Sequence, residues 1–176
     1  MQMVPATVFA NIAANGSGSP VFDHAYELRN PMAKAEKANH IMVINDVPEL
    51  VDVLRQVLED ANYRVTVDTF SDFDLEVMFA NIVKVKPDAL VLDLIMGGEM
   101  IGWQLLQRIK LDRTQSKLPI VLCTAAARQI GEIGAHLRTM NVAVILKPFD
   151  IDALLDAVAQ SLVGGPKMGL SIAEPS

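Results

Sequence analysis

Polar side chains suited to chemistry follow four separate apolar runs of the chain. Asn45 and Asp46 follow residues 41–44, Asp93 follows 89–92, Thr124 follows 120–123 and Lys147 follows 143–146. If these runs are neighbouring parallel strands, the five side chains meet at one edge of a sheet. Two carboxylates held together at such an edge repel each other and attract a hard divalent cation. Mg²⁺ is favoured, because it accepts one or two carboxylates and keeps several waters.

These residue types fit one reaction. An aspartate beside a divalent cation can attack a phosphoryl group and hold it as an aspartyl phosphate. A lysine would neutralise charge on the transferring group, and a threonine hydroxyl would bond one of its oxygens. Lys147 is the residue least easily explained otherwise, because a lysine at a buried strand end needs an anionic partner to stay charged. Asp93 is the candidate partner, and we expect it to be the phosphoacceptor.

Each residue also has a structural explanation. Asp46 precedes Pro48 and Glu49, which is the pattern of a helix N-terminus with a capping box. Asp93 could end a strand before a turn, and Thr124 could be a strand-end hydroxyl. Four such coincidences at one sheet edge are less expected than one shared site, so we favour the shared site.

Strand patterns and amphipathic helix patterns alternate five times between residues 40 and 163. The apolar runs 41–44, 89–92, 120–122 and 143–146 are typical of strands buried on both faces. Residues 64–70 alternate polar and apolar side chains, which predicts a half-exposed edge strand. Helical stripes are expected within 50–61, 75–82, 105–109, 127–139 and 151–162. Ser71 with Asp74 resembles a capping box, and Asp150 is a candidate cap.

This alternation predicts an α/β fold. Strictly alternating strands and helices give a parallel sheet with right-handed crossovers and helices on both faces. With five strands and the second at an edge, we expect the flavodoxin-like strand order 2-1-3-4-5. That order places the ligand crevice at the carboxyl ends of the first and third strands.

The ends of the chain differ from this region. The first 22 residues carry no charge, and residues 15–20 have the composition of a flexible linker. We expect a flexible extension over residues 1–39, a domain over 40–163 and a tail over 164–176. Natural translation could start at Met32, which lies shortly before the first strand.

The composition restricts the partners. The 176 residues carry a net charge of −6 and contain no cluster of Lys and Arg, so direct nucleic-acid binding is disfavoured. No apolar run approaches the roughly 20 residues needed to cross a bilayer. The lone Cys123 lies in an apolar run, and a buried unpaired cysteine is common in reducing compartments. We therefore expect a cytoplasmic protein with no membrane association.

Together the motifs resemble the receiver domain of bacterial two-component response regulators. Residues 41–49 resemble the family's acidic first strand and following helix, 87–96 its acceptor strand, and 119–125 its strand ending in threonine and a small residue. Gly102 matches the glycine that opens the third helix. Lys147-Pro148-Phe149 matches the Lys-Pro signature, in which that peptide is typically cis. The resemblance covers all but the two ends of the chain.

The resemblance implies a role for each site residue. Asp93 would take a phosphoryl group from the phosphohistidine of a sensor histidine kinase or phosphotransfer protein. Asp46, Asp93 and the backbone carbonyl of Ile95 would bind Mg²⁺. Thr124 and Lys147 would sense the phosphoryl group and bias the face built from the fourth helix, fifth strand and fifth helix, where a downstream protein would bind. Such a domain is a switch and not an enzyme.

Three residues depart from the family pattern. Asn45 stands where a second acid is usual, which predicts weaker Mg²⁺ binding. Val144 stands where the family usually has a Tyr or Phe that swings inward on activation, so the output coupling must differ or be weak. Gly97 replaces a common proline and makes the loop after the acceptor less rigid.

Two functions therefore stay open. The first is a stand-alone, phosphoaccepting receiver that acts through protein–protein contacts. The alternative is a degenerate receiver that binds proteins independently of phosphorylation; Asn45 and Val144 favour it, whereas the presence of Asp93, Thr124 and Lys147 opposes it. A phosphatase with an aspartate nucleophile fits less well, because that class typically has its nucleophile on the first strand.

Overall fold

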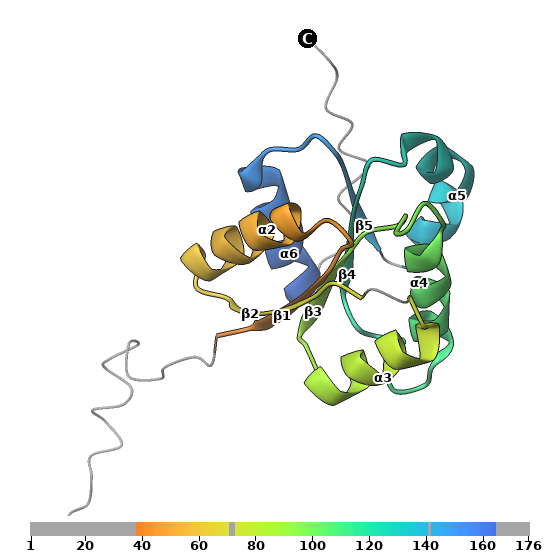
Figure 1. The fold of residues 1–176 in the computed structure, drawn as a ribbon, viewed down its shortest axis with the longest axis horizontal. Coiled ribbons are helices and arrows are strands. Elements are labelled where there is room, and N and C mark those ends of the chain that lie inside the picture. The colour runs from red at the N-terminus through yellow and green to blue at the C-terminus, as the bar shows by residue number, and fades with distance from the viewer. Residues whose placement is uncertain (1–37, 71–72, 141, 165–176) are drawn as a thin grey trace, which may run out of the picture. The chain divides into compact units, whose positions relative to one another are not determined.

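The computed structural model describes residues 38–70, 73–140 and 142–164. Strands and helices alternate along these residues (Figure 1). In chain order they are β1 (His40–Ile44), α2 (Pro48–Asp60), β2 (Arg64–Asp68), α3 (Leu75–Val85), β3 (Ala89–Leu92), α4 (Ile101–Leu111), β4 (Ile120–Thr124), α5 (Ala127–Thr139), β5 (Ala143–Leu146) and α6 (Ile151–Leu162).

The strands form one parallel sheet in the order β2-β1-β3-β4-β5. The predicted order is confirmed, and so is the edge position of β2, whose residues are exposed or half-buried. Ile44 pairs with both Asp68 of β2 and Leu92 of β3, and Leu92 pairs with Leu122 of β4. This register brings the carboxyl ends of the central strands level with one another.

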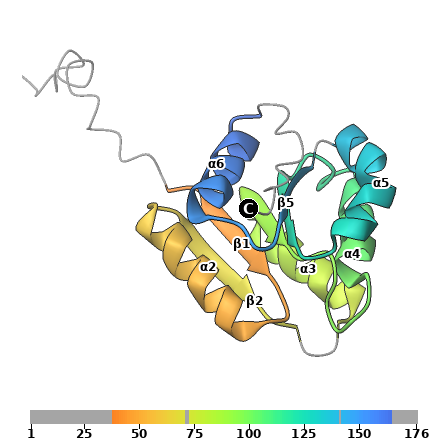
Figure 2. The same ribbon diagram turned by 90° about the horizontal axis from the view of Figure 1, so that it is seen from above.

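The sheet separates two apolar layers. Alternate strand residues such as Met42 and Ile44 pack with α3, α4 and α5, whereas Ile41 and Val43 pack with α2 and α6. Figure 2 shows the same division of the helices between the two faces. Because both faces are covered, the central strands need apolar residues at every position, which explains their continuous apolar runs.

The helix starts agree only partly with the sequence patterns. Asp150 caps α6 by accepting a hydrogen bond from the backbone N–H of Ala153 at 2.8 Å, as predicted. Asp74 is itself the N-cap of α3, so it is not the distal member of a capping box. Its expected partner, Ser71, lies outside the described residues. The N-cap of α2 is Val47, which makes no side-chain capping bond, so the capping interpretation of Asp46 is wrong.

The buried face of α6 differs in part from the apolar stripe that the sequence predicts for this helix, which consists of Ile151, Leu154, Leu155, Val158, Ala159 and Leu162. Leu154, Ala157 and Val158 are buried, whereas Ile151 is 51% exposed and Ala159 is exposed. Ala157 is 2% exposed and packs in the apolar layer that α2 and α6 share with the sheet. The hydrophobic pattern therefore predicted burial of Ile151, which is exposed, and did not predict burial of Ala157.

The predicted extension over residues 1–39 and the tail over 164–176, including the start at Met32, lie almost wholly outside the described residues. The first strand begins at His40 and the last helix ends at Leu162, close to the predicted limits of the domain. Within the part of the chain that the structure describes, no helix has the length and apolar character to span a membrane.

Candidate functional site

Asp93 is the centre of a buried polar cluster at the carboxyl edge of the sheet. It follows β3 directly and is only 6% exposed. Its Oδ2 accepts hydrogen bonds from Lys147 Nζ at 2.6 Å and from Asn45 Nδ2 at 2.9 Å. Its Oδ1 accepts a longer bond, of 3.3 Å, from the backbone N–H of Ile95. The predicted ion pair between Lys147 and Asp93 is therefore present in the structure.

The sheet ladder brings these three side chains together. The backbone N–H of Asp93 donates to Ile44 O at 3.0 Å, and that of Lys147 donates to Thr124 O at 2.9 Å. Each bond extends the ladder one residue beyond the last paired strand position. The peptide between Lys147 and Pro148 is cis, as the motif resemblance implied. Backbone pairing thus fixes the Cα positions from which the polar side chains converge.

Asp46 is bonded to the loop after the acceptor strand. Its Oδ2 accepts a hydrogen bond of 2.8 Å from the backbone N–H of Gly97. That loop is a tight turn in which Met96 and Glu99 exchange backbone hydrogen bonds of 3.0 and 3.1 Å. Gly97 and Gly98 have φ values of +60° and +81°, as two glycines at the centre of a primed turn require. The carboxylate therefore connects β1 to the turn that follows β3.

Gly102 allows α4 to approach the acceptor residue very closely. A Cβ added to Gly102 would lie 1.8 Å from the backbone oxygen of Asp93. The N–H of Gly102 donates to Leu94 O at 3.1 Å, which fixes the first turn of the helix against this strand end. Any other residue would force the helix away from Asp93, so the glycine is required by packing.

Thr124 adjoins the cluster through its backbone bond to Lys147, whereas Val144 lies within β5, and neither of these described side chains bonds to the Asp93 carboxylate. Thr124 is buried at the end of β4, and its Oγ1 accepts a hydrogen bond of 3.2 Å from the N–H of Ala126. Val144 is buried in the apolar layer shared with α3, α4 and α5. Asn45 is buried as well, and its Oδ1 accepts from the N–H of Val47 at 2.9 Å, so both ends of its amide are bonded.

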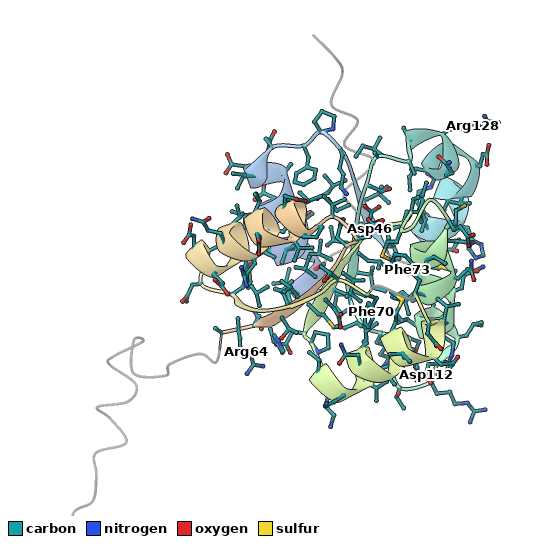
Figure 3. All side chains as sticks on the ribbon, in the orientation of Figure 1. Asp46, Arg64, Phe70, Phe73, Asp112 and Arg128 are labelled. Atoms are coloured by element: carbon teal, nitrogen blue, oxygen red, sulfur yellow. The ribbon has the colours of Figure 1, made fainter. Side chains whose placement is uncertain are left out.

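Two contacts at this site were not predicted. They are the hydrogen bond between Gly97 and Asp46 and the packing of the Phe73 ring against Gly97. Asp46 and Phe73 are both labelled in Figure 3. The hydrogen bond joins residues 51 positions apart. No periodic pattern relates such positions, because the contacts depend on how three loops meet at the edge of the sheet. The pair of adjacent glycines was the one local signal of a special turn.

A model of the response regulator receiver domain matches residues 41–159. The chain belongs to this family. The C4-dicarboxylate transport transcriptional regulatory protein of Pseudomonas aeruginosa is 30% identical over 137 residues, which are 76% of this chain but 27% of that protein. The chain thus spans about a quarter of that relative. An uncharacterized 14.6 kDa protein of Leptolyngbya boryana is 32% identical over 126 residues, which are 72% of this chain and 92% of that protein.

The solved structures agree on the receiver fold. The chemotaxis protein CheY4 of Vibrio cholerae superimposes with a TM-score of 0.58 at 19% identity, over 72% of this chain and all of that one. At this identity the likeness supports the fold alone. The five-stranded order found here is the order predicted from the alternation of strands and helices.

The residues at the carboxyl edge of the sheet offer oxygen donors of the kind that a hard divalent cation prefers. Asp46 and Asp93 would offer carboxylate oxygens to such an ion, and Ile95, two residues after Asp93, would offer its backbone carbonyl. Among the described residues no group of three or more His, Cys, Asp and Glu side chains could hold a metal ion. An all-oxygen set with only two carboxylates suits Mg²⁺, which keeps several of its waters and does not need an all-protein cage.

Cys123 has a packing role beside this site. It is 1% exposed within β4, and burial raises the pKa of its thiol to about 12, with the nearby Asp93 charge adding to the rise and Lys147 opposing it. The thiol therefore stays protonated at neutral pH and is a poor nucleophile. The predicted burial of Cys123 is confirmed.

Proposed function

We propose that this chain is a stand-alone receiver whose Asp93 accepts a phosphoryl group from the phosphohistidine of a sensor histidine kinase or phosphotransfer protein, in a Mg²⁺-dependent reaction. The observation that carries the proposal is the placement of Lys147 Nζ 2.6 Å from the buried Asp93 carboxylate. A buried lysine–aspartate pair at a sheet edge is costly to build for stability alone. A site that must neutralise a phosphoryl group explains why both charges are kept.

The contacts of Asp93 assign its two oxygens different roles. Oδ2 is held by Lys147 and Asn45, so Oδ1, with only the longer bond from Ile95, is the nucleophile. Attack by Oδ1 on phosphorus forms the O–P bond as the bond from phosphorus to the donor imidazole nitrogen breaks. The imidazole leaves with that electron pair. Bound between Asp46, Asp93 and the Ile95 carbonyl, Mg²⁺ would neutralise charge on the phosphoryl oxygens.

The switch would act through Thr124 and Lys147. The Thr124 hydroxyl bonds to the loop at the start of α5, and Lys147 lies at the end of β5. If either side chain exchanged its present partner for a phosphoryl oxygen, its movement would shift the face built from α5, β5 and α6. A downstream protein would bind at this face. Val144 offers no aromatic ring to move in this response, so the coupling must run through the backbone and the Thr124 contact.

One relative and the chemistry of Cys123 support the proposal of a stand-alone, cytoplasmic regulator. The match to the Leptolyngbya protein covers nearly all of that 14.6 kDa chain, which is the size of one receiver. The unpaired, buried Cys123 is in keeping with a reducing compartment. In this proposal the chain is a phosphoacceptor switch and not an enzyme, and its output is contact with another protein.

The second candidate is a degenerate receiver that binds its partner without phosphorylation. Asn45 favours it, because its Nδ2 already donates to the acceptor carboxylate where the family usually places an acid. An amide in that position removes one negative charge from the metal site. The two candidates make opposite predictions about covalent modification.

The deciding experiment measures intact-protein mass after incubation with a small-molecule phosphodonor. The protein is tested with Mg²⁺ and with a chelator, beside an Asp93→Ala control. A Mg²⁺-dependent gain of one phosphoryl group that is absent from Asp93→Ala supports the phosphoacceptor. No gain at saturating Mg²⁺ would favour the degenerate receiver.

A further inference from the structure

We propose that Phe73 is a positioning residue for the metal site: its ring holds the Gly97 peptide so that this peptide's N–H orients the Asp46 carboxylate. The inference rests on the proposed Mg²⁺ site and adds a residue from the loop between β2 and α3. Phe73 lies on a different segment from every residue assigned to the site above. Figure 3 labels Asp46 and Phe73.

The Phe73 ring is packed directly on the Gly97 backbone. A Cβ built on Gly97 would lie 2.6 Å from Cε2, 3.2 Å from Cδ2 and 3.4 Å from Cζ of this ring. The ring therefore occupies the space in which a side chain at position 97 would lie. With Phe73 against one side of Gly97 and Asp46 bonded to its N–H, the peptide is fixed from two directions.

The backbone at Phe73 supports a specific role for the ring. Phe73 has a φ of +48°, in the left-handed region that a bulky residue rarely adopts. The following residue, Asp74, is the N-cap of α3, so the strained residue is anchored by the helix start. Backbone strain of this kind persists where the surrounding structure imposes it. Here the conformation delivers a half-buried ring onto the glycine turn.

The hydrogen bond explains how the ring would affect a cation. Gly97 N–H donates to Oδ2 of Asp46 at 2.8 Å. In this proposal the bond restricts rotation of the carboxylate and leaves Oδ1 available to the ion. Groups that orient a metal ligand without touching the metal commonly matter about tenfold or more for affinity. The turn has no side chains at positions 97 and 98 to pack against its surroundings, so in this proposal the Phe73 ring adds to the backbone bonds that hold it.

The test compares Phe73→Ala with a matched control, Phe70→Ala. Both phenylalanines are half-buried in the same segment and pack against the same apolar layer, but the ring atoms nearest to a Gly97 Cβ belong to Phe73. Dissociation constants for Mg²⁺ and Mn²⁺ are measured by Trp103 fluorescence on the full chain. We expect Phe73→Ala to weaken binding about tenfold, and Phe70→Ala to leave it within about twofold of the unsubstituted protein.

A second readout follows the amide itself. In the metal-free protein, the Gly97 amide proton resonance should move upfield and exchange faster in Phe73→Ala, as in Asp46→Asn, and stay in place in Phe70→Ala. Phe73→Tyr keeps the ring and should restore both the resonance and the affinity. This rescue separates positioning from a loss of folding, because a merely structural role of the loop would not set the Gly97 resonance.

Three results would overturn the inference. They are unchanged metal affinity in Phe73→Ala, equal loss in Phe70→Ala and Phe73→Ala, and a Gly97 resonance that does not respond to Phe73→Ala. If the unsubstituted protein is phosphorylated with Mg²⁺ and Phe73→Ala binds the ion equally well, the positioning role fails while the proposed function stands. If the unsubstituted protein binds neither ion, both fail together.

Discussion

Replacement of Asn45 by Asp tests the electrostatics of the site most directly. Asn45 Nδ2 lies 2.9 Å from Asp93 Oδ2 and donates a hydrogen bond to it. In Asn45→Asp that donor becomes a carboxylate oxygen, so an attraction becomes a repulsion between two buried like charges. Without a cation the variant should be less stable than the unsubstituted protein, and with Mg²⁺ it should recover.

The magnitude follows from the distance. Two unit charges 2.9 Å apart repel by about 6 kcal/mol at an effective dielectric constant of about 20. Rotation of the new side chain and its attraction to Lys147, which is 2.6 Å from Asp93, reduce this figure. We expect the free energy of unfolding in chelator to fall by about 2–4 kcal/mol, as is usual for an unpaired buried charge.

Mg²⁺ should restore much of the stability that Asn45→Asp loses in chelator. An ion that binds only the folded state adds about 2.7 kcal/mol at a concentration one hundred times its dissociation constant. The extra carboxylate should also tighten binding, so that the variant's dissociation constant is lower by about tenfold, equivalent to about 1.4 kcal/mol. Urea unfolding followed by Trp103 fluorescence, in chelator and in saturating Mg²⁺, measures both effects.

Asn81→Asp is the matched control. Asn81 of α3 also donates its amide to an aspartate, Asp68 at the end of β2. This variant should likewise lose stability in chelator, but Mg²⁺ should restore less of it, because the Asp68 pair lacks the further carboxylate and the backbone carbonyl of the proposed metal set. If Asn45→Asp is as stable as the unsubstituted protein in chelator and binds Mg²⁺ no more tightly, the account of this site is refuted.

Three further outcomes are expected. Gly131→Ala should raise the free energy of unfolding by about 0.5–1 kcal/mol, because nothing lies within 4 Å of the added methyl in α5. Gly102→Ala should lower the free energy of unfolding by at least about 3 kcal/mol, because the added methyl clashes with Asp93 O. Urea unfolding measures both changes. Cys123, whose thiol pKa burial raises to about 12, should react with a thiol reagent at pH 8 only after unfolding, and rapid labelling of the native protein would contradict this. Burial raises the pKa of Asp68 above 3.8 in the folded protein. Its contribution to the free energy of unfolding is therefore full below pH 3.8 and is lost as the pH rises through the folded pKa. Asp68→Asn should remove this part of the pH dependence of unfolding.

The sheet and most of the site could be predicted because they depend on local patterns. Continuous apolar runs identified the central strands, and polar residues directly after them identified Asp93, Thr124 and Lys147. Their meeting at one edge follows from strand order, which alternation of strands and helices nearly determines. The Lys147–Asp93 pair is the clearest success, because a buried charge requires a partner and few were available.

The predictions that were wrong depend on contacts between loops. Asp46 was a reasonable helix cap from the sequence alone, since Pro48 and Glu49 follow it. In the structure its carboxylate bonds instead to Gly97, a residue whose position is set by a turn in another part of the chain. The contact of Phe73 with Gly97 is equally hidden, because neither the type nor the spacing of Phe73 predicts its left-handed backbone.

The contact between Gly102 and Asp93 has a mechanical consequence. Between most helices and strands, side chains act as a deformable layer that absorbs small movements. At Gly102 the helix backbone meets the Asp93 carbonyl with no side chain between them. We therefore expect a small displacement of Asp93 to move the start of α4 with it, because the two backbones are in close contact there.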